Sequence, residues 1–148
     1  MKKIGVLLIL AFSLSILQSQ NVYKVEESEN EVVYGKSIKL FLGDKVYIQT
    51  KVKNNKIKEF TLVGRIKDST TTIILTFNED LLELDNNTFL KVVNPFDKTL
   101  HYKAKIRPYN KIKYFKTSII PIFPKIYSVE MWPYKIESIV LSGFKLIK

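Results

Sequence analysis

The sequence contains no cysteine, one histidine, and only 5 glycines and 5 prolines in 148 residues. The absence of cysteine excludes disulfides, cysteine nucleophiles, cysteine zinc sites and a lipidated N-terminal cysteine. A single histidine, His101, excludes a multi-histidine metal site, and we expect no Ser-His-Asp triad around it. The glycines are scattered singly, so there is no glycine-rich phosphate loop. We therefore expect no enzyme, no metal and no cofactor.

What is present is basic and apolar. Lysine and arginine number 24 against 14 aspartate and glutamate, a formal net charge of +10, and 46% of the residues are hydrophobic. This composition is globular, and the length suits one domain. With 9 Phe, 8 Tyr and 1 Trp, the chain can fill a single core. Without disulfides, the stability of that domain has to come from packing.

The N-terminus has the parts of a secretory signal peptide. Lys2 and Lys3 give a positive start, residues 4–17 are mostly apolar, and small Ser19 suits a cleavage site. A helix over the apolar run would span about 21 Å, short of the roughly 30 Å hydrocarbon core of a membrane. We predict cleavage after Ser19; an uncleaved anchor or a buried N-terminal helix are the alternatives.

These features predict three parts: residues 1–19 as signal peptide, 20–31 as a mobile charged lead-in, and 32–148 as the folded domain. The predicted mature chain contains no second apolar stretch long enough to cross a membrane. We expect an exported protein that is periplasmic, cell-surface or extracellular.

Residues 32–148 are dominated by the period-two alternation of half-buried strands. Residues 45–53 alternate, the turn residues Asn54 and Asn55 follow, and residues 57–63 resume an extended pattern, which predicts a hairpin. Residues 70–77 are rich in β-branched side chains and predict a buried strand. The clearest strand places four residues on an apolar face and four on a polar face: Leu100, Tyr102, Ala104 and Ile106 against His101, Lys103, Lys105 and Arg107.

Turn signals recur about every 8–12 residues, which is typical of a β-sandwich or barrel. Short extended segments are expected at 113–117, 118–123, 127–131, 136–141 and 144–147, the last two separated by a turn at Ser142-Gly143. Residues 78–85 fit either a helical turn or a strand. We predict an all-β fold, a single antiparallel sandwich of about seven to nine strands.

One stretch carries a resemblance to a known fold. Asn94-Pro95-Phe96, followed by the alternating strand from Leu100 to Arg107, resembles a strand pair of immunoglobulin-like sandwiches, here without their cysteine pair. The chain is also similar in pattern to small exported bacterial proteins. The resemblance implies an immunoglobulin-like sandwich; it implies no activity, because one fold hosts many functions.

The basic excess is the main functional lead. Lys103, Lys105 and Arg107 recur every second residue on one strand face, about 7 Å apart. If neighbouring strands bring further lysines beside them, they form a positive face for anionic envelope polymers or lipid head groups. The alternative is that lysines simply keep polar strand faces soluble and protect sheet edges.

Trp132 is the second candidate. Beside Pro133 and Tyr134, an exposed Trp132 would offer a platform on which a sugar ring stacks. The alternative is that Trp132 closes one end of the sandwich core. Carboxylates at 79–85 match neither a glycosidase pair nor a calcium loop, and they fit a solvated connection.

These observations predict an exported, non-enzymatic module that recognises a protein partner or an anionic envelope component. The alternative is a carbohydrate-binding domain centred on Trp132, or a hydrolase. We expect no nucleic-acid partner, and the sequence leaves the oligomeric state open.

Overall fold

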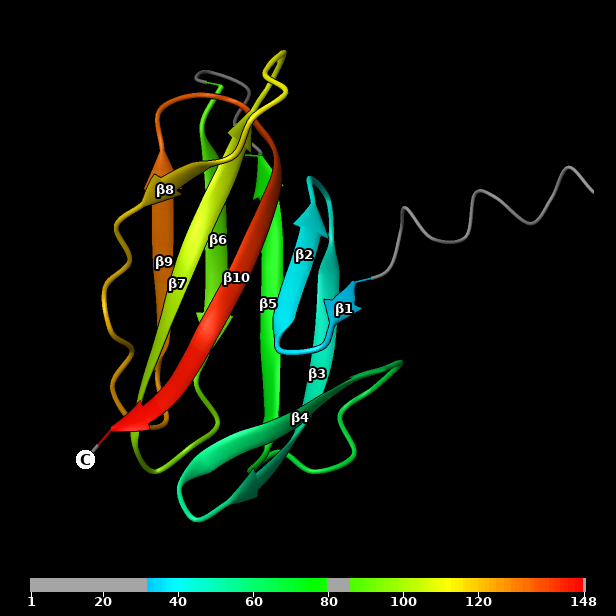
Figure 1. The fold of residues 1–148 in the computed structure, drawn as a ribbon, viewed down its shortest axis with the longest axis vertical. Helices are drawn as coiled ribbons and strands as arrows, with labels where there is room; N and C mark the ends of the chain where they lie inside the picture. The colour runs from blue at the N-terminus through cyan, green and yellow to red at the C-terminus, as the bar shows by residue number, and fades with distance from the viewer. Residues whose placement is uncertain (1–31, 80–85, 148) are drawn as a thin grey trace, which may run out of the picture. The chain divides into compact units, whose positions relative to one another are not determined.

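The structure, a computed structural model, describes residues 32–79 and 86–147. Within these ranges the chain forms strands and no helix, arranged as two five-stranded sheets (Figure 1). Sheet A has the order β1 (Val33–Tyr34), β2 (Ser37–Phe41), β10 (Ile136–Ile147), β7 (Thr99–Pro108) and β8 (Phe115–Thr117). Sheet B has the order β4 (Lys56–Val63), β3 (Lys45–Lys53), β5 (Thr72–Glu79), β6 (Thr88–Val93) and β9 (Tyr127–Trp132).

All neighbouring strands pair antiparallel. The predicted all-β antiparallel sandwich is therefore confirmed, with ten strands rather than seven to nine. The larger count includes β1 and β8, which have only two and three residues. The predicted signal peptide and lead-in, residues 1–31, lie outside the described residues. Of the ambiguous segment 78–85, Asn78 and Glu79 end β5, and the remainder also lies outside them.

The core lies between the two sheets and takes residues from both inner faces. Its fully buried large side chains are Ile38, Leu40, Ile48, Ile73, Leu75, Phe77, Leu90, Leu100, Ile122, Ile136, Ile139 and Leu141. Full burial of one such side chain is worth about 1.5–3 kcal/mol relative to leaving it exposed. Contact between these faces therefore supplies the stabilisation that the cysteine-free sequence has to obtain from packing.

The alternation predicted for β7 is present. Leu100, Tyr102, Ala104 and Ile106 are all buried, whereas Lys103 and Lys105 are exposed. The first predicted hairpin is also confirmed: β3 and β4 are joined at Asn54 and Asn55, with φ angles of 52° and 59°. Positive φ at both central residues is the requirement of a two-residue type I′ hairpin turn, and asparagine tolerates it.

The prediction of a turn at Ser142-Gly143 is wrong. Residues 136–147 form one strand, β10, and Ser142 and Lys145 pair with Lys103 and His101 of β7. One extra residue is thus inserted into β10, and Gly143 has a φ of 65°. A glycine in the left-handed region is the signature of a G1 β-bulge. The glycine bends the strand and does not reverse it.

Residues 118–123, expected as an extended segment, form no regular strand. Ile122 makes a single bridge to Leu100, and Pro121 and Pro124 lack the N–H groups that a strand ladder needs. Asn94 holds this segment instead. Its buried side-chain amide donates to the carbonyls of Ile122 at 3.0 Å and Phe123 at 3.0 Å.

Replacing Gly143 by Ala tests the bulge. A methyl group there would meet only ordinary contacts, 3.7 Å from Lys103 Cδ, so its cost is the left-handed backbone. We expect a loss of about 1–2 kcal/mol in the free energy of unfolding, measured with denaturant. Gly64→Ala is the matched control, since Gly64 has open space and no positive φ. That change should be neutral or stabilising by up to about 1 kcal/mol. Equal effects of the two changes would contradict the bulge.

Candidate functional site

The outward side chains of β7 are basic, because they alternate with the core residues of the same strand. Lys103 and Lys105 are exposed on the outer face of sheet A. Successive outward side chains on a strand are about 7 Å apart. The structure therefore places the two predicted lysines on one solvent-facing row.

The register of the neighbouring strands adds lysines to this row. Val140 of β10 pairs with Lys39 of β2 on one side and with Lys105 on the other. Lys105 also pairs with Lys116 of β8. Adjacent strands lie about 4.8 Å apart, so these side chains form a band across four strands of sheet A.

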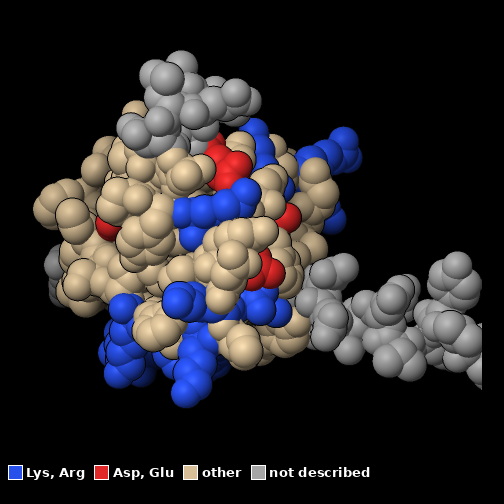
Figure 2. All heavy atoms as spheres, turned by 90° about the horizontal axis from the view of Figure 1, so that it is seen from above, with Lys and Arg blue, Asp and Glu red and all other residues tan. Residues whose placement is uncertain are grey.

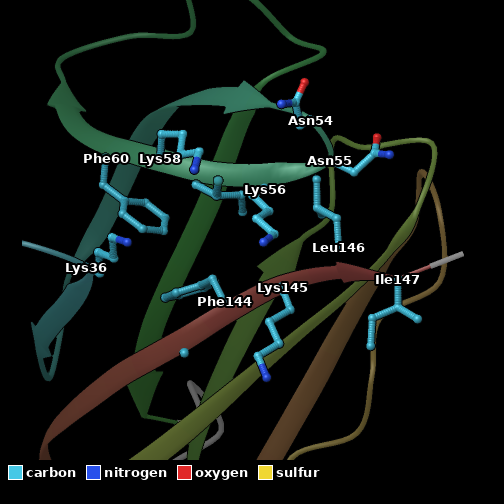
Figure 3. Close-up of a pocket in the computed structure, with 12 residues that line it drawn as sticks. Lys36, Asn54, Asn55, Lys56, Lys58, Phe60, Phe144, Lys145, Leu146 and Ile147 are labelled. Carbon is cyan, nitrogen blue, oxygen red and sulfur yellow. The ribbon is translucent and has the colours of Figure 1, made fainter.

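Lys145 extends the same surface. It pairs with His101, and one bulge separates it from Ser142, which pairs with Lys103. Figure 3 shows the Lys145 side chain directed away from β4. We call the five residues Lys39, Lys103, Lys105, Lys116 and Lys145 the basic face. Within residues 32–79 and 86–147, none of the five is in an ion pair.

Arg107, the third predicted residue, has a different role. Its Nη2 donates to Glu137 Oε1 at 2.9 Å, and its Nε donates to Ser138 Oγ at 3.2 Å. The guanidinium also lies over the ring of Tyr114, 5.8 Å from the centroid. These contacts fix Arg107 and offset its charge, so it borders the basic face and is not free to bind an anion.

The distribution of charge on the side of the molecule seen in Figure 2 is uneven. Figure 2 looks down from above Figure 1, so the sheet nearer the viewer in Figure 1, sheet A, lies toward the lower edge. Lysine and arginine side chains gather along that edge, with few acidic side chains between them. The view agrees with the register, which collects lysines on the outer face of sheet A.

The edge strand β9 of sheet B has different chemistry. Along the edge strand β9, Tyr127, Val129 and Met131 are exposed and alternate with inward side chains. Lys91 of β6 pairs with Val129, and its Nζ lies 4.3 Å from the ring centroid of Tyr127. Sheet A therefore presents lysines, and the edge of sheet B presents apolar side chains.

Trp132 lies in the core. Its side chain is only 7% exposed, and its Nε1 donates to Thr117 Oγ1 of β8 at 3.1 Å. This contact links the edge strands of the two sheets, because Trp132 ends β9 of sheet B. A sugar-stacking platform needs an open ring face. The burial therefore favours the core alternative and gives no support to the carbohydrate hypothesis.

Tyr102 is a titratable group in the core whose pKa is shifted. Burial raises the pKa of the Tyr102 phenol, and the negative charge of nearby Glu130 raises it further. Tyr102 thus stays protonated near neutral pH. In the described part of the chain there is no group of three or more potential metal ligands. The same residues contain no helix that is long and apolar enough to span a membrane.

Sequence reasoning identified Lys103 and Lys105 and did not connect Lys39 or Lys145 with them. Each of these two lies on a strand far from β7 in the sequence, and only the register of β10 joins all three strands. Comparison with known proteins found no matching family model, no matching curated protein and no matching solved structure.

Trp132 is the only tryptophan, so its fluorescence reports its surroundings directly. We expect blue-shifted emission in the native state and weak quenching by iodide, because the ring is shielded from water. Unfolding in denaturant should shift the emission to the red and restore quenching. A native spectrum like that of the unfolded chain would contradict the burial of Trp132.

Proposed function

We propose that this chain is an exported, non-enzymatic binding module of immunoglobulin-like type. Its ligand would be an anionic component of the cell envelope, bound by the basic face. The observation that carries the proposal is the pairing of Lys105 directly opposite Lys116, with Lys39 and Lys103 close by. Like charges directly opposite each other on a sheet are destabilising. An anionic ligand would relieve that repulsion, so the arrangement favours binding over stability alone.

The chemistry of the face favours an anionic polymer or lipid surface over a folded protein. Protein interfaces depend on buried aromatic and arginine anchors. The free cations of the basic face are all lysines, and lysine binds phosphate as a point charge with little geometric demand. A regular array of point charges suits a ligand with repeating negative groups.

A protein partner is the second candidate, and it would use the other sheet. The exposed side chains of Tyr127, Val129 and Met131 on β9 are of the kind that anchors protein interfaces. Such binding would depend little on salt and would not require the basic face. The same experiment therefore separates the two candidates.

The test is cosedimentation of the purified protein with vesicles that contain anionic lipid, with purely zwitterionic vesicles as the reference. We expect binding to the anionic vesicles that fades as salt is added, because salt screens exposed charges. Each lysine near an anionic surface contributes about 1 kcal/mol, so Lys103→Ala with Lys105→Ala should weaken binding roughly 30-fold.

The matched control is Lys45→Ala with Lys91→Ala. These lysines share a row on the outer face of sheet B through Thr76, and their loss removes the same formal charge. Equal weakening by the two double variants would show that net charge, not the basic face, drives binding. Vesicle binding that is unchanged by added salt and by the Lys103→Ala/Lys105→Ala changes would overturn the proposal and favour the apolar edge at β9.

A further inference from the structure

A cleft of about 590 Å³ opens between β4 and the C-terminal half of β10 (Figure 3). Its volume is within the range of roughly 300–1,000 Å³ typical of small-molecule sites. Four of its twelve lining residues are lysines and none is acidic. The cleft adjoins the basic face: Lys145 belongs to the basic face and also lines the cleft, with its side chain directed away from β4.

The floor of the cleft is apolar and aromatic. The ring of Phe144 lies 5.0 Å from that of Phe60 and 5.5 Å from that of Tyr102, between centroids. Tyr102 is buried, whereas Phe60 and Phe144 are half-buried. The three rings form a series that runs from the core to the cleft and joins sheet A to sheet B. Buried Ile57 and half-buried Leu146 complete the apolar lining.

Three exposed lysines form the rim. Lys36, Lys56 and Lys58 all line the cleft, and Figure 3 shows Lys56 directed from β4 toward the gap between β4 and β10, near the rings of Phe60 and Phe144. Lys56 also pairs with Lys53 across the hairpin. Within the described residues no ion pair is made by Lys36, Lys53, Lys56 or Lys58. A negative group in the cleft would offset this concentration of like charge.

Bulges on the two facing strands place key side chains. In β4 the partners change from Lys51–Glu59 to Val52–Ile57, so Lys58 is the extra residue. In β10 the bulge contains Gly143 and Phe144, between the paired residues on either side. Bulges redirect side chains and are over-represented at binding sites. The two strands thus use their irregular positions to direct a cation and a ring toward the cleft.

We propose that this cleft binds a single anionic amphiphile, with its acidic head at Lys36, Lys56 and Lys58 and its apolar body on Phe60, Phe144 and Leu146. The head would be a carboxylate or a phosphate and the body a hydrocarbon chain. A purely polar anion would leave the apolar floor of the cleft uncovered. A neutral hydrocarbon would leave the lysines of the rim without a negative partner. The ligand would be a free molecule, taken up one per chain, not a bilayer surface.

The probes are laurate and dodecyl phosphate at concentrations below micelle formation, titrated into the purified protein by calorimetry. We expect one molecule of either to bind per chain. Inorganic phosphate, which has only the head, and dodecyl maltoside, which has the same tail without charge, should bind at least about tenfold more weakly. Amide NMR shifts on binding should concentrate at residues 56–60 and 143–147. Shifts centred elsewhere, or equal binding of either partial probe, would overturn the proposal.

Lys56→Gln with Lys58→Gln removes charge from the rim and keeps the apolar floor. We expect about tenfold weaker binding of laurate, because two charge-assisted contacts are lost. The control, Lys103→Gln with Lys105→Gln, removes the same charge from the basic face and should leave laurate binding within about twofold. Equal losses in both variants would contradict the cleft site. The Lys56→Gln/Lys58→Gln variant should still bind anionic vesicles, because the proposed function depends on Lys103 and Lys105. Failure of the cleft proposal and failure of the proposed function can therefore be told apart.

Discussion

Apolar contact between the inner faces of the two sheets is the interaction on which the other features of this domain depend. Because the sequence has no cysteine, no disulfide can join the sheets. Ile106 and Leu100 of β7 pack into the same core as Ile73 and Phe77 of β5. When one face of a strand packs into that core, the alternate side chains of the strand point to solvent. The lysines of β7 are therefore outside because Leu100, Tyr102, Ala104 and Ile106 are inside.

The ends and edges of the sandwich are closed by polar contacts and irregular backbone. Asn94 fixes the proline-interrupted segment through its side-chain amide, and its Oδ1 accepts the Phe96 N–H at 2.9 Å. Trp132 bridges to β8 through Thr117. Bulges in β4, the other edge strand of sheet B, and in β10 leave a cleft with an aromatic floor. The regular strands thus build the core, and the departures from regularity form the surface features.

Sequence reasoning succeeded where structure is local. The alternation of residues 100–107 and the turn at Asn54 and Asn55 depend on neighbouring residues, and both were predictable from period and turn chemistry. It failed at Gly143, because a glycine with positive φ serves a turn and a bulge equally well, and the choice depends on the partner strand β7. The sequence likewise left open whether Trp132 is buried, because its surroundings include residues of the other sheet such as Thr117.

The candidate sites show the same division. Lys103 and Lys105 were evident from one strand, whereas Lys39 joins them only through the long-range register of β10. The cleft could not be predicted at all. Lys36, Lys58 and Phe144 are distant in sequence, and bulges in two different strands bring the last two to the same gap. The alternation of residues in the sequence identifies which face of a strand is polar. The pairing of strands in the sheet decides which polar residues of different strands lie side by side.

The central claim is that β7 divides its residues between core and basic face, and paired unfolding measurements on Ile106→Ala and Lys105→Ala test it most directly. Ile106 is 3% exposed, and its truncation should cost about 2–5 kcal/mol through lost burial and a cavity. Lys105 faces water, and its truncation should change the free energy of unfolding by less than about 0.5 kcal/mol. Comparable losses from both substitutions, or a larger loss from Lys105→Ala, would contradict the account.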